Sequence, residues 1–180
     1  MAAPYRRAAM SDAPATLIPL EAVPPDMVEA LLDRAFGARR LERTAYAVRE
    51  GTQWLPTLSF AATDAEDMLV GTIQVWPVAL TVEEKRHPML MVGPVAVVPE
   101  RQGEGFGHAL MAAMTDALDP EAPLPQVMVG DPDYYARFGF TAAATGGWDL
   151  PGPFERERLL VRASNPAVLP EKGTLGPWIG

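Results

Sequence analysis

Residues 92–110, which read VGPVAVVPERQGEGFGHAL, decide how the rest of the chain is organised. An apolar run ends at Pro99, glycines follow at positions 103, 105 and 107, and an apolar pattern with helical spacing begins at Phe106. This order predicts a strand, a glycine loop and a helix. The N–H groups and the positive dipole end at a helix N-terminus favour an anion, and glycine lets that anion approach the backbone. We therefore expect an anion-binding loop.

The strand that leads into this loop carries an interruption at Gly93-Pro94. Proline has no N–H to donate to a neighbouring strand, and glycine inside a strand often marks a β-bulge. The strand from Met89 to Val98 is almost wholly apolar, so we expect it to lie in the centre of the sheet. A bulge at Gly93-Pro94 is expected to open the sheet just before the glycine loop.

The rest of the chain predicts one α/β (α+β) domain over residues 14–180, after a flexible N-terminus at residues 1–13. Its sheet is expected to be mixed and mostly antiparallel, with flanking helices. Because a crossover helix precedes the strand at 126–129, that strand should run parallel to the one before it. Other strands are expected at 15–20, 56–62, 68–77, 141–145 and 157–163. Helices are expected at 25–36, 106–118 and 133–138, with an irregular helix in 38–52, a charged loop at 81–88 and an irregular tail from 164.

The amino-acid composition excludes some kinds of function and argues against others. The chain has 180 residues, no cysteine and two histidines, so disulfides, a cysteine nucleophile and thiolate metal sites are excluded, and we expect no metal. The net charge of −8 argues against non-specific binding of nucleic acid. No apolar run reaches the roughly 18 residues that cross a bilayer. No apolar segment follows Arg6 and Arg7, as a secretory signal would require, so we expect a cytoplasmic protein without a membrane partner.

The spacing of the glycines does not fit the two commonest nucleotide-binding loops. A dinucleotide-binding loop requires Gly-x-Gly-x-x-Gly directly after a strand, whereas the glycines here are at 103, 105 and 107 after a polar lead-in. A P-loop requires Lys and then Ser or Thr after the last glycine, and this chain has His108 and Ala109. Three glycines within five residues are also more than a tight turn needs.

Two motifs carry a resemblance to a known family. Gln102, Gly105 and Gly107 fit the pattern Gln or Arg, two residues, Gly, one residue, Gly or Ala. About 25 residues further on, residues 130–140 read GDPDYYARFGF, with a tyrosine pair followed by Gly-Phe. In this order and on these elements, the motifs resemble the acetyl-CoA-binding and later signatures of the GCN5-related N-acetyltransferases (GNAT). The residues of the two motifs are similar to those of a bacterial subgroup of predicted acetyltransferases.

The resemblance implies a GNAT-like fold and acetyl-CoA as the co-substrate. Main-chain groups of Val95 and Val97 would pair with the pantetheine arm as if it were an added strand. The amides from 103 to 108 would surround the pyrophosphate, with Gln102 at the entry of the loop. The residues implied in binding acetyl-CoA are thus Val95, Val97, Gln102, Gly103, Glu104, Gly105, Phe106, Gly107 and His108.

The resemblance also implies a catalytic role for Tyr135, which matches a tyrosine close to the thioester sulfur in many members. A phenol keeps its proton at neutral pH and can donate it to a leaving thiolate. Tyr134 is the alternative donor. In the other interpretation, Tyr135 is an aromatic residue of the core without a catalytic role. The amine would attack the thioester carbonyl directly, and a strand amide at the bulge could polarise that carbonyl. The base stays open among water and four side chains: Glu83, Glu84, His87 and Asp131.

Other interpretations remain at this point. Many members carry Asn seven residues before the tyrosine, whereas this chain has Met128. The chain could be a catalytically inactive acyl-CoA-binding sensor or interaction module, or an unrelated nucleotide-binding protein. As an enzyme, it would transfer acetyl groups to the primary amine of a small molecule or peptide. A homodimer is possible, and the acidic surface is compatible with a cationic amine.

Overall fold

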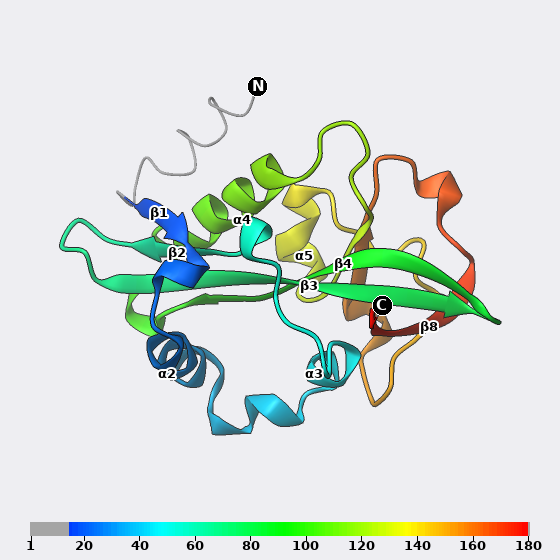
Figure 1. Cartoon of the computed structure of the whole chain (residues 1–180), viewed down its shortest axis with the longest axis horizontal. Coiled ribbons are helices and arrows are strands. Elements are labelled where there is room, and N and C mark those ends of the chain that lie inside the picture. The colour runs from blue at the N-terminus through cyan, green and yellow to red at the C-terminus, as the bar shows by residue number, and fades with distance from the viewer. Residues whose placement is uncertain (1–14, 180) are drawn as a thin grey trace. The chain divides into compact units, whose positions relative to one another are not determined.

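The computed structural model describes residues 15–179 (Figure 1), so the predicted N-terminus at 1–13 lies outside the described residues. The helices are α2 (Pro25–Phe36), α3 (Thr44–Val48), α4 (Phe106–Ala117) and α5 (Pro132–Tyr135). The strands are β1 (Thr16–Pro19), β2 (Phe60–Thr63), β3 (Leu69–Val82), β4 (Lys85–Val97), β5 (Gln126–Val129), β6 (Gly147–Asp149), β7 (Leu159–Arg162) and β8 (Lys172–Pro177). Short 3₁₀ turns are η1 (Leu20–Ala22), η2 (Ala38–Glu42), η3 (Pro56–Leu58), η4 (Pro99–Arg101), η5 (Ala136–Phe138), η6 (Arg156–Arg158) and η7 (Pro166–Val168).

Eight strands of the described chain form a mixed sheet. Hydrogen-bonded pairs join them in the order β1-β2-β3-β4-β5-β7, and β8 pairs with β3 and β6. The β4–β5 and β6–β8 pairs are parallel, whereas β1–β2, β2–β3, β3–β8 and β5–β7 are antiparallel. The prediction of a mixed, mostly antiparallel sheet with flanking helices is therefore confirmed, and so is the parallel course of β5 beside β4.

The contacts divide the chain into two compact units, each built from several segments. Within the described residues, the first unit comprises 15–40, 55–75 and 94–118, and the second comprises 41–54, 76–93 and 119–179. The long strands β3 and β4 each contribute one end to the first unit and the other end to the second.

In the first unit, α2 and α4 lie on opposite sides of the strands (Figure 1). Helix α2 begins at Pro25, where the missing N–H of proline costs nothing, and ends before Gly37, whose φ of 88° suits glycine. Its apolar residues at helical spacing, Val28, Leu31 and Leu32, are buried. Helix α4 packs against β1 and β2, and it too buries one continuous apolar face.

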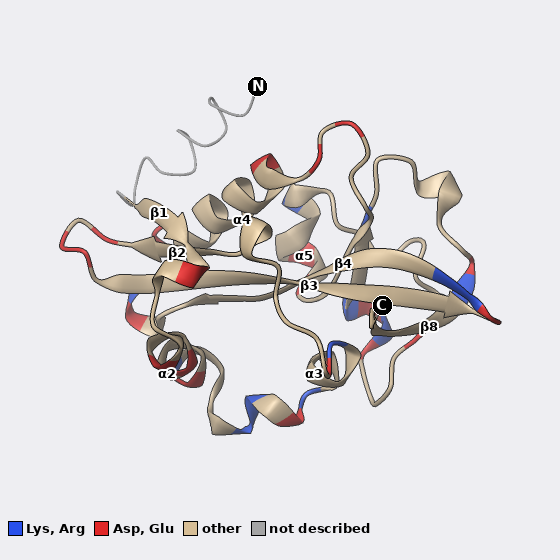
Figure 2. Ribbon diagram, in the orientation of Figure 1, with Lys and Arg blue, Asp and Glu red and all other residues tan. Residues whose placement is uncertain are grey.

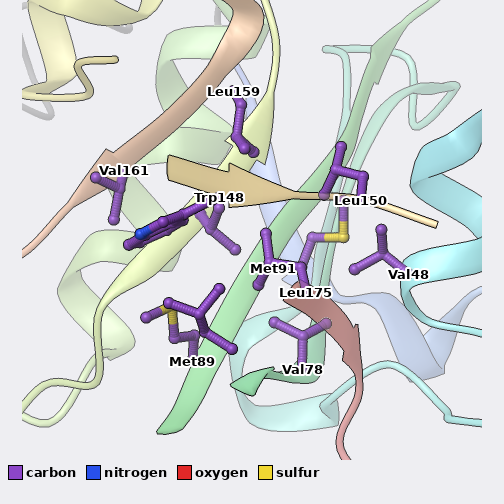
Figure 3. Packing of buried hydrophobic residues seen from close by; sticks show 11 residues of the cluster. Val48, Val78, Met89, Met91, Trp148, Leu150, Leu159, Val161 and Leu175 are labelled. Atoms are coloured by element: carbon purple, nitrogen blue, oxygen red, sulfur yellow. The ribbon is translucent and has the colours of Figure 1, made fainter. Parts of the chain in front are cut away.

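In the second unit, a buried cluster is built around Trp148 of β6 (Figure 3). The Trp148 side chain is fully buried, and its Nε1 donates a hydrogen bond to the Pro170 carbonyl at 2.8 Å, so its polar atom has a partner. Apolar residues from α3, from five strands and from the position just after β6 surround it: Val48, Val78, Leu80, Met89, Met91, Val127, Leu150, Leu159, Val161 and Leu175.

The structure corrects four predicted elements. The charged loop predicted at 81–88 is wrong, because β3 and β4 extend to a two-residue turn at Glu83-Glu84, where Glu83 has a φ of 57°. Residues 56–58 form η3 and not the start of a strand. The predicted strand at 141–145 is reduced to a single bridge between Thr141 and Val161. Part of the tail expected to be irregular forms β8, which pairs with β3.

Candidate functional site

The glycine loop joins β4 to α4 in the first unit through conformations that favour glycine. Gly103 has a φ of 83° and Gly105 a φ of 94°, both in the left-handed region. Gly105 is the N-cap of α4, and no side chain caps the helix there. The first N–H groups of an α-helix have no partner inside the helix. Without a capping side chain, the amides at the start of α4 can bind an anion.

Ion pairs of Glu100 and Arg101, both in the 3₁₀ turn η4, hold this loop. The Arg101 guanidinium donates to Asp64 Oδ2 at 2.6 Å and to Glu104 Oε2 at 2.8 Å. Before it in the chain, Glu100 receives two hydrogen bonds from Arg34, at 2.6 and 2.7 Å. Because Arg101 is already bound by two carboxylates, it adds little net positive charge to the loop.

These ion pairs shift the pKa values of the groups that form them. The pKa of the Asp64 carboxyl is lowered, first by the hydrogen bond from the Met68 amide and then by the one from Arg101. The pKa of Glu100 is lowered chiefly by its hydrogen bond with Arg34. The pKa of Arg101 is raised by Glu104 and Asp64. All three groups therefore stay charged over the whole neutral range of pH.

Charge on the surface of α4 is sparse. Figure 2 shows acidic residues along α2 and in the turn between β2 and β3, whereas the ribbon of α4 is almost uncharged. The helix contains Asp116 in its last turn and neither lysine nor arginine. An anion at the start of α4 would therefore depend on main-chain N–H groups and the helix dipole.

Two of the residues predicted for the glycine-loop site, Gln102 and Val97, are joined by a hydrogen bond. Gln102 Nε2 donates to the Val97 carbonyl at 3.4 Å, so the loop entry is tied to the end of β4. Val95 and Val97 are half-buried residues on β4, and Phe106 is buried on the inner face of α4. Glu104, Gly107 and His108 are half-buried, whereas Gln102 and Gly103 are exposed.

Pairing between β4 and β5 ends just before the predicted interruption at Gly93-Pro94. The parallel ladder between β4 and β5 consists of Leu90 with Gln126 and Met91 with Val127, although β5 continues to Val129. The ladder thus ends two residues before Gly93, which has a φ of 128° that few other residues adopt. This agrees with an opening of the sheet at Gly93-Pro94.

Tyr135 lies in the second unit, at the end of α5. Its ring contacts Tyr134 edge-on, with 4.9 Å between centroids, and lies 6.2 and 6.4 Å from the rings of Phe138 and Phe140. Its hydroxyl makes no hydrogen bond with any other described residue. Burial, followed by Tyr134 and Asp131, raises the pKa of Tyr135 to about 12. The phenol is therefore protonated at neutral pH and able to donate.

The short helix that carries Tyr135 is fixed at both ends. Asp131 caps its start, because its carboxylate accepts a hydrogen bond from the Asp133 amide at 3.0 Å. At the other end Gly139, with a φ of 89°, closes the turn as predicted. Arg162 donates to the Phe138 carbonyl at 3.0 Å and to Gln126 Oε1 at 2.7 Å, which ties the turn to β5 and β7.

The candidate bases fall in two places. Glu83 and Glu84 are exposed at the tip of the β3–β4 hairpin, and His87 is half-buried on β4. Asp131 is the cap described above, so its carboxylate already has a structural task. No group of three or more His, Cys, Asp or Glu side chains able to hold a metal ion occurs in residues 15–179. In the same range, no helix is long and apolar enough to cross a membrane.

Sequence reasoning missed two residues that shape these elements. Gly130 follows β5, and a Cβ at this position would lie 2.7 Å from Cε2 of Tyr135, so the ring requires glycine there. Arg49 is buried and donates to the Gly93 carbonyl at 2.9 Å. A glycine immediately after an apolar strand was a readable signal for the first. Nothing in the local sequence separates Arg49 from the other arginines of 38–52.

The comparisons with known proteins agree with this architecture. A family model described as an acetyltransferase (GNAT) domain matches residues 25–143. The chain is 31% identical over 117 residues to the uncharacterized N-acetyltransferase YhbS of Escherichia coli (strain K12), a match that covers 65% of this chain and 68% of the relative.

Solved structures extend this likeness to most of the chain. The crystal structure of the GNAT family N-acetyltransferase YhbS from Escherichia coli in complex with CoA matches with a TM-score of 0.69 and 26% identity, over 92% of this chain and 90% of that one. A GNAT family acetyltransferase from Brucella melitensis, in complex with acetyl-CoA, matches with a TM-score of 0.58 and 22% identity, over 90% and 94% of the chains. At that identity it shows the fold alone.

A mixed sheet whose central strand leads through a glycine loop into an uncapped helix is the architecture of an acyltransferase of this kind. The chain belongs to the GNAT family of acetyltransferases. It is an acyltransferase, and the general reaction is acetyl transfer.

Proposed function

We propose that this protein transfers the acetyl group of acetyl-CoA to a primary amine, by direct attack of the amine nitrogen on the thioester. The observation that carries the proposal is the glycine loop, with left-handed glycines at an uncapped helix start, in a chain of this family. The similar E. coli protein was crystallised with CoA, which supports CoA as the carrier here.

The loop suits the pyrophosphate of CoA in its chemistry. Main-chain N–H groups of 103–108 would bind the phosphate oxygens, and a Cβ on Gly103 would meet no atom within 4 Å, so the loop is open on that side. Main-chain groups of Val95 and Val97 would bind the pantetheine arm as an added strand. The end of the β4–β5 ladder at Met91 is consistent with a free strand edge further along β4.

In the proposed reaction, the amine nitrogen bonds to the carbonyl carbon and the carbon–sulfur bond breaks. The Val95 amide would stabilise the developing oxyanion, and the Tyr135 hydroxyl would protonate the departing thiolate. The Tyr135 phenol carries a proton throughout the neutral range, as any tyrosine with a pKa of 10 or more does, and burial, which raises its pKa to about 12, makes it a weaker acid. The ammonium proton passes to water in this scheme, and Tyr135 regains its proton from solvent.

The acceptor is proposed as a small-molecule or peptide amine. The net charge of −8 supports a cationic acceptor and argues against nucleic acid as a partner. A cytoplasmic location and a homodimer remain predictions of the sequence.

The proposal is tested by following free thiol released from acetyl-CoA in the presence of a panel of amines. The panel should contain polyamines, amino acids, aminoglycosides, peptide N-termini and lysine peptides. We expect release well above hydrolysis with at least one class, together with one acetylated amine for each thiol. Tight CoA binding with no amine-dependent release would instead indicate a binding module. A melting temperature raised by ATP or NAD and not by CoA would contradict the cofactor.

A further inference from the structure

A buried arginine packs over two aromatic rings in the second unit. Arg49 follows α3 and is 6% exposed. Its guanidinium carbon lies 4.0 Å from the centroid of the Tyr46 ring and 4.1 Å from that of Trp76. Its Nη1 donates a hydrogen bond to the Gly93 carbonyl oxygen at 2.9 Å. Two ring contacts and burial restrict the orientation of the guanidinium, so the donor is aimed at this carbonyl.

The carbonyl that Arg49 binds belongs to the peptide at which β4 is interrupted. Carbonyl groups inside a sheet are normally bound by the N–H groups of a neighbouring strand. The nitrogen of the Gly93–Pro94 peptide has no hydrogen, and the ladder with β5 has already ended at Met91. Gly93 also has a φ of 128°. The hydrogen bond from Arg49 therefore restrains a peptide that can donate nothing to the sheet.

The unsatisfied N–H group of Trp76 indicates that the tryptophan is present for its contact with Arg49. Its Nε1 atom is buried and has no hydrogen-bond partner among the described residues, an arrangement that disfavours tryptophan in a protein interior. Phenylalanine would provide an aromatic face without this unsatisfied N–H group. Tryptophan, however, is the aromatic side chain that attracts a cation most strongly, and here that cation is Arg49.

We propose that Arg49 is a positioning residue for acetyl transfer. By fixing the Gly93–Pro94 peptide, Arg49 sets the direction of the next N–H group of β4, which belongs to Val95. In the proposed function this amide binds the acyl carbonyl, so the inference rests on that function. Arg49 acts through the backbone and does not itself touch the substrate.

The test compares Arg49→Met with Arg40→Met. Arg40 is the matched control, because it is also buried, at 4% exposed, and binds Glu29 and Asp33 on α2. We expect Arg49→Met to lower kcat about tenfold or more while the affinity for CoA changes less than about threefold, since a misaligned group costs rate more than binding. Arg40→Met should lower the melting temperature and leave both constants of the folded enzyme unchanged. Arg49→Lys, with charge but without a flat stacking face, should recover part of kcat.

A second readout does not depend on activity. Hydrogen exchange at the Val95 amide should be faster in Arg49→Met than in the wild type and in Arg40→Met. Unchanged exchange at Val95, or a loss of kcat no larger than that of Arg40→Met, would overturn the inference. If the wild type shows no amine-dependent turnover, the proposed function fails, and with it the role of Arg49 in the reaction. Faster Val95 exchange in Arg49→Met would then still show the restraint on β4.

Discussion

The glycine loop and the tyrosine helix α5 are held in place by different forces. Ion pairs of Arg101 and Arg34 surround the loop, of which Arg34–Glu100 is exposed and Arg101–Asp64 has a buried carboxylate, and the groups proposed to bind the ligand are main-chain amides. Tyr135 is held by aromatic rings, and burial raises its pKa to about 12. The loop can therefore bind through its backbone conformation, whereas the acid strength of the Tyr135 phenol depends on the residues packed around it.

The largest effect is expected for Tyr135→Phe, which removes the proposed proton donor and keeps the ring. Loss of a general acid lowers kcat by about 100-fold or more, and the affinity for CoA should not change. The matched control is Tyr134→Phe, which removes the neighbouring hydroxyl. Steady-state thiol release and CoA titration measure the two constants. A large loss of kcat in Tyr134→Phe alone would transfer the role to Tyr134.

A smaller effect, on binding and not on rate, is expected for Arg101→Met. This change leaves Asp64 and Glu104 without their cation beside the proposed pyrophosphate site. Repulsion between carboxylates and phosphate should weaken CoA binding by roughly tenfold to thirtyfold, with kcat at saturation unchanged. The double variant Arg101→Met/Glu104→Gln should recover part of the affinity. If the double variant binds CoA no better than the single one, Glu104 does not face the anion.

The close approach of Tyr135 to Gly130 gives a third prediction, in which kcat falls less than in Tyr135→Phe. A Cβ at Gly130 would overlap the Tyr135 ring, so Gly130→Ala must displace the ring. We expect kcat to fall about tenfold with CoA affinity unchanged, because misplacing a reacting group by a fraction of an ångström costs rate. Gly146→Ala is the control, since a Cβ there meets no atom within 4 Å. Equal kcat in the two variants would show that the position of the Tyr135 ring does not matter.

The smallest effects concern stability at the two extremes of pH. The folded protein keeps Tyr135 protonated above the pH at which an unfolded tyrosine ionises, so its contribution is present below about pH 10 and is lost as pH rises towards 12. The pKa of Asp64 is lowered, so its contribution is present at neutral pH and is lost as pH falls through the acid range. Denaturant midpoints across pH should show a shallower alkaline decline in Tyr135→Phe and a shallower acid decline in Asp64→Asn. Curves parallel to that of the wild type would contradict these assignments.

Most of what the sequence predicted correctly depends on local patterns. Helix α4, the closing Gly139 and the parallel course of β5 follow from periodicity, from glycine preferences and from the crossover rule. The β3–β4 hairpin tip was missed because charged residues at 83–87 look like a loop, although an exposed hairpin end tolerates such residues equally well. Strand β8 was missed because a stretch rich in glycine and proline forms a strand only by pairing with β3 and β6.

In the candidate site too, some features follow from the local sequence and others depend on the folded chain. The left-handed glycines of the loop could be anticipated from three glycines before a helical pattern. The raised pKa of Tyr135 could not, because it depends on burial and on charges that only the folded chain brings near the phenol. The hydrogen bond from Arg49 to the Gly93 carbonyl spans 44 positions in sequence, and no local pattern predicts such a contact.

The central claim is that the glycine loop binds CoA through its backbone amides. It is tested most directly by titrating ¹⁵N-labelled protein with CoA and following every amide by NMR. We expect the largest shifts at the amides from Gly103 to His108, with further shifts at Val95 and Val97. Binding that leaves the Gly103–His108 amides unchanged while other amides shift would contradict it.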